Sequence, residues 1–243
     1  MFLELQGDNR YKSVFFEILK YQLTRGSLQL EGISAEAKDV EQSLKVYNQF
    51  SAINFMFNNE ADYSHFGFTS MLCEVVSLVS GGEIAEFRKT RAQVNGSNVE
   101  RSNASMIRND LWYLIDDYNY QLSIAKTKKE IFEAEAFFHI RFLHIHPFED
   151  ANGRTARILL TYNLAKNNIA PCIITIDRKR EYCDYIENSD IKGLASLFEK
   201  LSNDELKIMI AIYNDLDKRG LIPSNKMNDE QLDRYERNIR YKK

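Results

Sequence analysis

The chain has 243 residues, enough for one large domain or two small ones with a substantial buried core. Its hydrophobic fraction of 44% and charged fraction of 28% are those of an ordinary globular protein, which excludes a fibrous or largely disordered chain. The formal net charge of -3 gives no general attraction to nucleic acid or to an anionic membrane, so a phosphate-binding site must be local.

The amino terminus and the cysteines indicate a compartment. The start at Met1 lacks a basic segment followed by a long apolar run, and no later stretch is apolar enough to span a bilayer. Cys73, Cys172 and Cys183 are odd in number and lack the spacing of zinc ligands or of a redox pair, which argues against a disulfide framework. We expect a cytoplasmic protein whose three cysteines are buried and apolar.

Apolar residues recur at spacings of three and four along most of the chain, which predicts amphipathic helices. The helices are expected over residues 11–23, 40–57, 107–120, 131–145, 152–164 and 195–213. Ser80-Gly81-Gly82 marks a break, and Asn95-Gly96 is a turn signal between short strand-compatible pieces, which predicts one small β-hairpin. The predicted fold class is mainly α.

One short segment between two of these helices, residues 146–157, combines an imidazole, an acid, an amide, a glycine and two guanidinium groups. Gly153 allows the backbone to approach a ligand, and the N–H groups at the start of the next helix attract an anion. Arg154 and Arg157 lie three residues apart on that helix, so both can point toward one polyanion. The segment predicts a phosphate site.

The acid and the imidazole add chemistry to this site. Asp150 offers a hard oxygen ligand for Mg²⁺. His146 titrates near neutral pH and can accept a proton from a hydroxyl group. Because in-line phosphoryl chemistry depends on positioning, a metal ion and neutralised charge, these residues are sufficient in principle for such a transfer.

The segment resembles the signature of the Fic family, His-x-Phe-x-Asp/Glu-Gly/Ala-Asn-Gly/Lys-Arg-x-x-Arg, and fills every signature position. Residues 136–171 are similar to the two central helices of that fold, and the Asn95-Gly96 hairpin lies where the family has its target-docking flap. The resemblance covers residues 1 to about 200. It implies a Fic-type helical bundle and a protein adenylyltransferase, which uses ATP and Mg²⁺ to attach AMP to a hydroxyl of a protein.

The resemblance implies a catalytic set of His146, Asn152 and Arg154. His146 would deprotonate the target hydroxyl, which then attacks the α-phosphorus of ATP, and pyrophosphate would leave with the metal. Phe148 would anchor the loop in the core, and Asp150 would bind Mg²⁺.

The resemblance also implies how the nucleotide is held. Asn152 and the backbone N–H groups near Gly153 would hold the α-phosphate, while Arg154 and Arg157 would take the distal phosphates. Ala151 replaces the commoner glycine, a departure that the family tolerates. A looser correspondence places three residues around the adenine and ribose, namely Tyr182, Tyr185 and Asn188.

Upstream, Ser27-Leu-Gln-Leu-Glu31-Gly32 resembles the inhibitory motif of the family, Ser/Thr-x-x-x-Glu-Gly/Asn, in the class with an N-terminal inhibitory helix. A Glu31 carboxylate that reaches Arg157 would occupy the guanidinium fork meant for the γ-phosphate, so ATP would bind in a poor orientation for attack. The resemblance therefore implies an autoinhibited enzyme, with Glu31 as an ordinary exposed acid as the alternative.

We expect a single Fic-type domain over residues 1–243. Within it, residues 1–36 would carry the inhibitory helix, 37–200 the catalytic core and 201–243 a helical extension. The expected partners are ATP, a protein target that offers a Ser, Thr or Tyr hydroxyl, and the chain itself as a target. Neither nucleic acid nor a membrane is expected, and a homodimer is left open.

Other functions use similar residues. The same site could remove AMP, with Glu31 aligning a water, or could transfer UMP or phosphate. A nucleotide-binding regulatory module is a further alternative, against which the intact His146 argues. A transition-metal hydrolase built on His144, His146, Glu149 and Asp150 is disfavoured because no His-Glu-x-x-His arrangement is present.

Overall fold

The structure, a computed structural model, describes residues 9–34, 40–82, 84–94 and 97–221. Its helices are α2 (Asn9–Leu30), α3 (Val40–Asn58), α4 (His65–Ser80), α5 (Ile107–Ile124), α6 (Lys128–Ile145), α7 (Asn152–Lys166), α8 (Lys179–Glu187) and α9 (Ile191–Lys218). Two short 3-10 helices, η1 (Ala104–Met106) and η2 (Ile176–Arg178), precede α5 and α8. The mainly α fold class is confirmed, and α4 and α8 add helices that the apolar spacing had not indicated.

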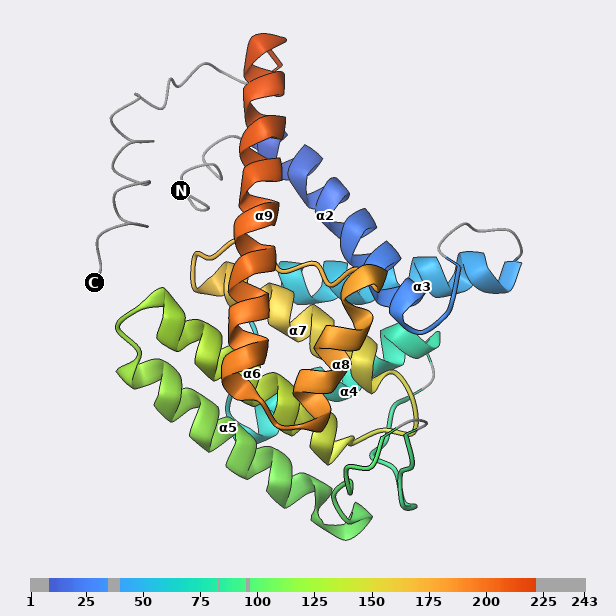
Figure 1. Ribbon diagram of the computed structural model, residues 1–243. Helices are drawn as coiled ribbons and strands as arrows, with labels where there is room; N and C mark the ends of the chain where they lie inside the picture. Colours follow the sequence, from blue (N-terminus) through green and yellow to red (C-terminus); the bar gives the residue numbers. More distant parts are fainter. Residues whose placement is uncertain (1–8, 35–39, 83, 95–96, 222–243) are drawn as a thin grey trace.

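Helix α7 lies at the centre of the bundle (Figure 1), where it contacts α2, α3, α4 and α6. It is buried on all sides from Asn152 to Leu164, apart from the half-buried Gly153. A helix that is buried all round belongs to the core of a protein, whereas a surface helix keeps one polar face. The polar residues at the amino end of α7 are therefore buried because they belong to the core helix.

Local signals fix both ends of α6. Thr127 Oγ1 accepts a hydrogen bond from Glu130 N at 3.2 Å, and Glu130 Oε2 accepts one from Thr127 N at 2.8 Å, which forms a capping box. The helix ends at His146, whose φ of 51° and ψ of 61° are left-handed. Since α6 also packs on α5, α7 and α9, its carboxyl end is a rigid support for the following loop.

The expected β-hairpin is not confirmed. None of the described residues belongs to a strand, and the Asn95-Gly96 turn itself lies outside the described residues. The main chain on either side of the turn bonds to α6 and its loop: Arg88 N donates to Pro147 O at 2.9 Å and Ser102 N to His144 O at 3.4 Å. Because these main-chain N–H groups bond to the end of α6 and its loop, they are not available for the hydrogen bonds of a β-hairpin.

The expected boundary at residue 200 falls inside α9, which continues without a break to Lys218. Beyond that position, Leu206 and Met209 of α9 pack with Phe15 and Leu19 of α2 in a small apolar cluster. The described part of the extension therefore packs on α2, the helix that precedes the candidate inhibitory residue Glu31. The rest of the expected extension, residues 222–243, lies outside the described residues.

Two further expectations concern exposure. No helix of the described residues is long and apolar enough to cross a membrane.

Cys172 is buried, but Cys73 is only half-buried and Cys183 is exposed on α8, so the expectation that all three cysteines are buried is wrong. Cys183 lies on the polar side of a short surface helix, which the spacing of cysteines alone does not reveal.

Candidate active site at the amino end of α7

The loop between α6 and α7 is closed by Asn152. Its Oδ1 accepts a hydrogen bond from Phe148 N at 3.0 Å, and its Nδ2 donates to Phe148 O at 2.8 Å. The Phe148 ring is buried against Phe87, with centroids 5.4 Å apart, as expected for an anchor. Because both ends of the Asn152 amide are bonded within the loop, the structure gives this side chain a loop-closing contact, and its contact with the α-phosphate stays a prediction.

Ala151 precedes α7 in a left-handed conformation, with φ of 68° and ψ of 2°. A side chain in this region costs roughly 1–2 kcal/mol relative to the right-handed form, whereas glycine is nearly free of this penalty. This conformation gives the physical reason why glycine suits the position. Asp150 Oδ1 accepts a hydrogen bond from Ala151 N at 2.6 Å and so supports the turn.

Arg157 is buried in α7 and is bound by the last turn of α2. Its Nε donates to Ser27 Oγ at 2.8 Å, and its Nη2 donates to Ser27 O at 3.1 Å and to Glu31 Oε1 at 2.8 Å. A Cβ added at Gly153 would lie 3.0 Å from Arg157 Nη1 and 3.4 Å from Glu31 Oε1. Both candidate inhibitory residues therefore bind the Arg157 guanidinium, and Glu31 also lies close to Gly153, where a phosphate was expected.

Arg154 extends this arrangement in a way that the sequence did not indicate. Glu31 Oε2 lies 2.9 Å from Arg154 Nε, although the N–H direction is not that of a hydrogen bond. On its other side, Arg154 Nη2 donates to Asp150 Oδ2 at 2.8 Å. One carboxylate from the end of α2 thus bridges two guanidinium groups. The spacing of four residues between Asp150 and Arg154 was a usable sign of their pair.

His146 is half-buried at the carboxyl end of α6. Burial is the main cause that lowers the pKa of its imidazole to about 4, with the charges of Arg101 and Arg88 acting in the same direction. A hydrogen bond to the backbone of Leu143 and the charge of Asp150 partly oppose this shift. The imidazole is therefore neutral at pH 7, the form that can accept a proton.

The expected metal ligand, Asp150, has a side chain that is 81% exposed at the rim of this site. The described residues contain no group of three His, Cys, Asp or Glu side chains that could hold a metal ion. A single exposed carboxylate suits Mg²⁺ that arrives with nucleotide phosphates, because Mg²⁺ is commonly held by one or two carboxylates plus substrate and water. Glu149 is engaged elsewhere, since its Oε1 accepts a hydrogen bond from Thr90 Oγ1 at 3.0 Å.

Tyr182 does not face an open site. It is 4% exposed, and burial raises its pKa to about 12. Its hydroxyl shares a 2.6 Å hydrogen bond with Nε2 of His139, whose pKa burial lowers to about 3. Tyr182 therefore belongs to the core behind Arg157. Its expected place beside the nucleotide base stays a prediction.

The other two base-binding candidates form their hydrogen bonds within α8. Tyr185 Oη donates to Glu181 Oε1 at 3.3 Å, and Asn188 Nδ2 donates to Asp184 O at 2.8 Å. His144 ties α6 to the same helix by donating from Nε2 to Ile186 O at 2.9 Å. His144 thus has a structural contact, and no metal-holding group that includes it is found among the described residues.

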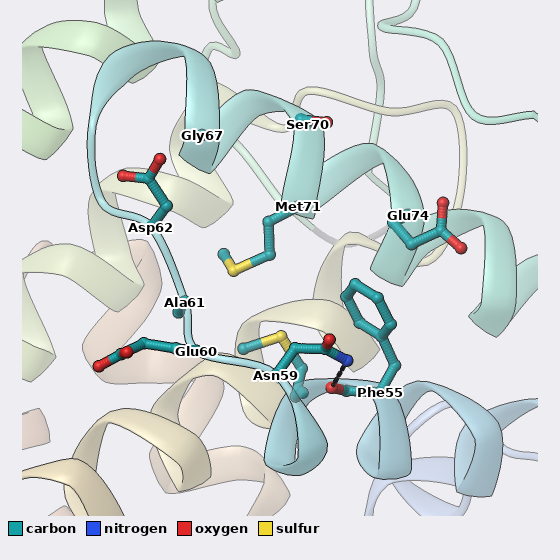
Figure 2. Close-up of a pocket in the computed structure, with 10 residues that line it drawn as sticks. Phe55, Asn59, Glu60, Ala61, Asp62, Gly67, Ser70, Met71 and Glu74 are labelled. Atoms are coloured by element: carbon teal, nitrogen blue, oxygen red, sulfur yellow. Dashed lines mark hydrogen bonds between the residues drawn. The ribbon is translucent and has the colours of Figure 1, made fainter.

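A cavity of about 440 Å³ lies elsewhere, between the carboxyl end of α3 and the first turns of α4. Figure 2 shows Phe55 and Met71 at this cavity, with Glu60, Asp62 and Glu74 around it. None of the site residues expected from the sequence lines it. The cavity is therefore separate from the phosphate site at α7.

Comparisons with known proteins point to the same segment. The sequence model of the Fic/DOC family matches residues 69–164, which include all of 146–157. The protein adenylyltransferase Fic of Aedes aegypti is 40% identical over 52 residues, and that of Drosophila grimshawi is 26% identical over 145 residues. These matches cover 21% and 58% of this chain, but the chain spans only 10% and 28% of those relatives.

Solved structures share the fold at low sequence identity. Residues 134–508 of Fic-1 from C. elegans align with a TM-score of 0.65 and 18% identity, covering 80% of this chain and 63% of that one. A Fic-domain-containing signaling protein from Bacteroides thetaiotaomicron aligns with a TM-score of 0.63 and 18% identity, covering 87% and 88% of the two chains. The likeness extends well beyond the short motif.

Proposed function

Because the chain contains a Fic domain, we propose that it is a protein adenylyltransferase, which transfers AMP from ATP to a hydroxyl of a protein and is inhibited by Glu31. The observation that carries the proposal is the bridge from one Glu31 carboxylate to two buried guanidinium groups, Arg154 and Arg157. Buried guanidiniums at the amino end of a helix favour a polyanion. The inhibitory carboxylate lies where such an anion would bind.

The residues of the loop suit this reaction. Neutral His146 accepts the proton of the target hydroxyl, while that oxygen forms its bond to the α-phosphorus. The bond between the α-phosphorus and the oxygen bridging to the β-phosphate breaks, and pyrophosphate leaves. Arg154 and Arg157 orient the distal phosphates. Asp150 would hold Mg²⁺, which neutralises phosphate charge when bound.

Inhibition follows from the same contacts. While Glu31 binds Arg157 and lies against Arg154, the γ-phosphate has no free guanidinium to fix it, and the α-phosphate is misaligned relative to the attacking oxygen. The Glu31 side chain is 27% exposed, whereas those of Arg154 and Arg157 are 7% and 6% exposed. The carboxylate is therefore the member of the pair that can leave for solvent.

The direct test is intact-mass spectrometry of the Glu31→Gly variant and of wild type after incubation with ATP and Mg²⁺, alone and with cell lysate. We expect AMP to be added to the variant or to a lysate protein, much less with wild type, and none when His146→Ala is combined with Glu31→Gly. Parallel reactions with UTP distinguish the donor. A folded Glu31→Gly protein that transfers no group from any nucleotide would contradict the proposal, and loss of AMP from a modified protein would favour the reverse reaction.

A further inference from the structure

The described parts of an irregular segment, residues 84–94 and 97–103, lie against the carboxyl end of α6, just before the loop. The last carbonyl groups of a helix have no partners inside the helix and are bound from outside. Here the consecutive carbonyls of residues 143–147 all accept hydrogen bonds from this segment. Each main-chain carbonyl from residue 143 to residue 147 is therefore hydrogen-bonded to the neighbouring segment.

Arg88 supplies the central contacts of this attachment. Its Nε donates to His146 O at 2.7 Å, and its Nη2 donates to Ile145 O at 3.1 Å. The same guanidinium also donates to Thr90 O at 2.6 Å and to Ser102 O. Arg88 is only 2% exposed, and all four of these acceptors are main-chain carbonyls. The Arg88 guanidinium therefore holds the main chain of its own segment against the main chain at the end of α6.

The two α6 carbonyls that Arg88 binds belong to the peptide groups on either side of the His146 Cα. The φ and ψ of a residue are defined by the orientation of those two peptide planes. His146 has φ of 51° and ψ of 61°, a region that few residues other than glycine adopt. Such a conformation persists only where the surroundings over-determine it, and Arg88 holds both planes.

We propose that Arg88 is a positioning residue for the transfer reaction, because it holds the backbone of His146 in its left-handed conformation and so sets where the imidazole lies. The inference rests on the function proposed above. Arg88 acts through His146 and is not itself expected to touch the nucleotide. Lysine is a poor substitute, since one ammonium group lacks the planar fork that spans several carbonyls.

The kinetic test uses Arg88→Lys and Arg88→Met in the Glu31→Gly background, with Arg91→Met as the control. Misplacement of a catalytic group by about 1 Å lowers a rate on the order of 10²-fold, so we expect kcat to fall by that amount in both Arg88 variants. The KM for ATP should stay within about threefold, because uniform binding of the nucleotide is not altered. Arg91 lies in the same segment with a side chain 82% exposed, and its replacement should leave kcat unchanged.

A second readout does not depend on activity. The His146 ring is titrated by ¹H–¹³C NMR and identified among the four histidines by its loss in His146→Gln. In Arg88→Met the His146 pKa should rise from about 4, because one nearby positive charge is lost. In Arg88→Lys it should stay low, while the ¹³Cα shift of His146 moves away from its left-handed value in both variants.

These outcomes separate the inference from the function on which it rests. If the Glu31→Gly protein transfers no nucleotide, the proposed function fails, and the ¹³Cα shift still shows whether Arg88 sets the His146 backbone. If Arg88→Met does not fold in a thermal melt, Arg88→Lys decides the question, because it keeps the buried charge. A folded Arg88→Lys enzyme with the kcat of its background and an unchanged His146 ¹³Cα shift would overturn the inference.

Discussion

The two helix ends that meet at the candidate site are held by different kinds of contact. The carboxyl end of α6 is held by hydrogen bonds to consecutive main-chain carbonyls, three of them from the buried Arg88. The amino end of α7 is instead covered by one partly exposed carboxylate, Glu31, which lies on Arg154 and Arg157. The part that must stay fixed in the proposed reaction has many backbone contacts, whereas the proposed brake depends on one side chain that can be displaced.

The largest expected effect follows from removing the base at the fixed end. His146→Ala in the Glu31→Gly background should lower AMP transfer by about 10²–10⁴-fold, the usual range for loss of a general base. ATP binding should change little, because His146 is not a phosphate ligand in this account. Transfer of label from α-labelled ATP and equilibrium ATP binding measure the two effects. Equal transfer rates with and without His146 would remove it from the mechanism.

A smaller loss is expected from Asp150→Ala, which removes the proposed Mg²⁺ ligand and the ion pair to Arg154 at the α7 end. Activity should become low at every Mg²⁺ concentration, because no equally placed acid replaces Asp150. Glu149→Ala is the matched control, since Glu149 bonds to Thr90. If the dependence of AMP transfer on Mg²⁺ were normal in Asp150→Ala but impaired in Glu149→Ala, the Mg²⁺ ligand would be Glu149 and not Asp150.

Away from the two helix ends, α6 and α7 are joined in the core by a buried carboxyl group whose titration can be tested. Glu135 of α6 is fully buried and accepts hydrogen bonds from Tyr118 Oη at 2.5 Å and from Asn163 Nδ2 of α7 at 3.2 Å. Burial raises the pKa of its carboxyl to about 8. A pKa raised in the folded state gives stability that is present below about pH 4.5 and is lost as the pH rises through about 8.

Glu135→Gln cannot ionise, so its free energy of unfolding should improve relative to wild type as the pH rises from 5 to 8. The difference can change by at most about 1.4 kcal/mol for each pH unit. Urea denaturation followed by circular dichroism at several pH values measures it. Parallel pH profiles for the two proteins would show that Glu135 does not titrate in this range.

The smallest expected effect concerns the left-handed residue before α7. Ala151→Gly should stabilise the protein by up to about 1 kcal/mol, because relief of the left-handed strain outweighs the greater freedom of glycine in the unfolded chain. Ala165→Gly, near the end of the same helix, is the matched control and should destabilise by about 1 kcal/mol. Thermal melts compare the two, and destabilisation of similar size by both changes would contradict the strain at Ala151.

Most of the helices and the α7 end of the site could be predicted from the sequence, whereas the contacts at the α6 end could not. Helices α2, α3, α5, α6, α7 and α9 followed from apolar spacing, whereas α4 and α8 did not. The α7 end was predictable because its residues lie within one short segment, residues 146–157. The Glu31 to Arg157 contact joins residues 126 apart and was reached only through a family motif. Arg88 carried no sequence signal, because its partners are main-chain carbonyls, which every residue type possesses. The burial of Tyr182 was not predicted, because a loose correspondence says nothing of burial.

The most direct test of the account is the rate of AMP incorporation measured side by side for wild type, Glu31→Gly and Glu31→Gly combined with Arg157→Ala. Glu31→Gly should exceed wild type on the order of 10²-fold with little change in melting temperature, because the α-phosphate becomes aligned. The double variant should fall below Glu31→Gly, because it lacks the γ-phosphate contact. A Glu31→Gly protein that folds normally but incorporates no more AMP than wild type would contradict the claim that Glu31 is the brake.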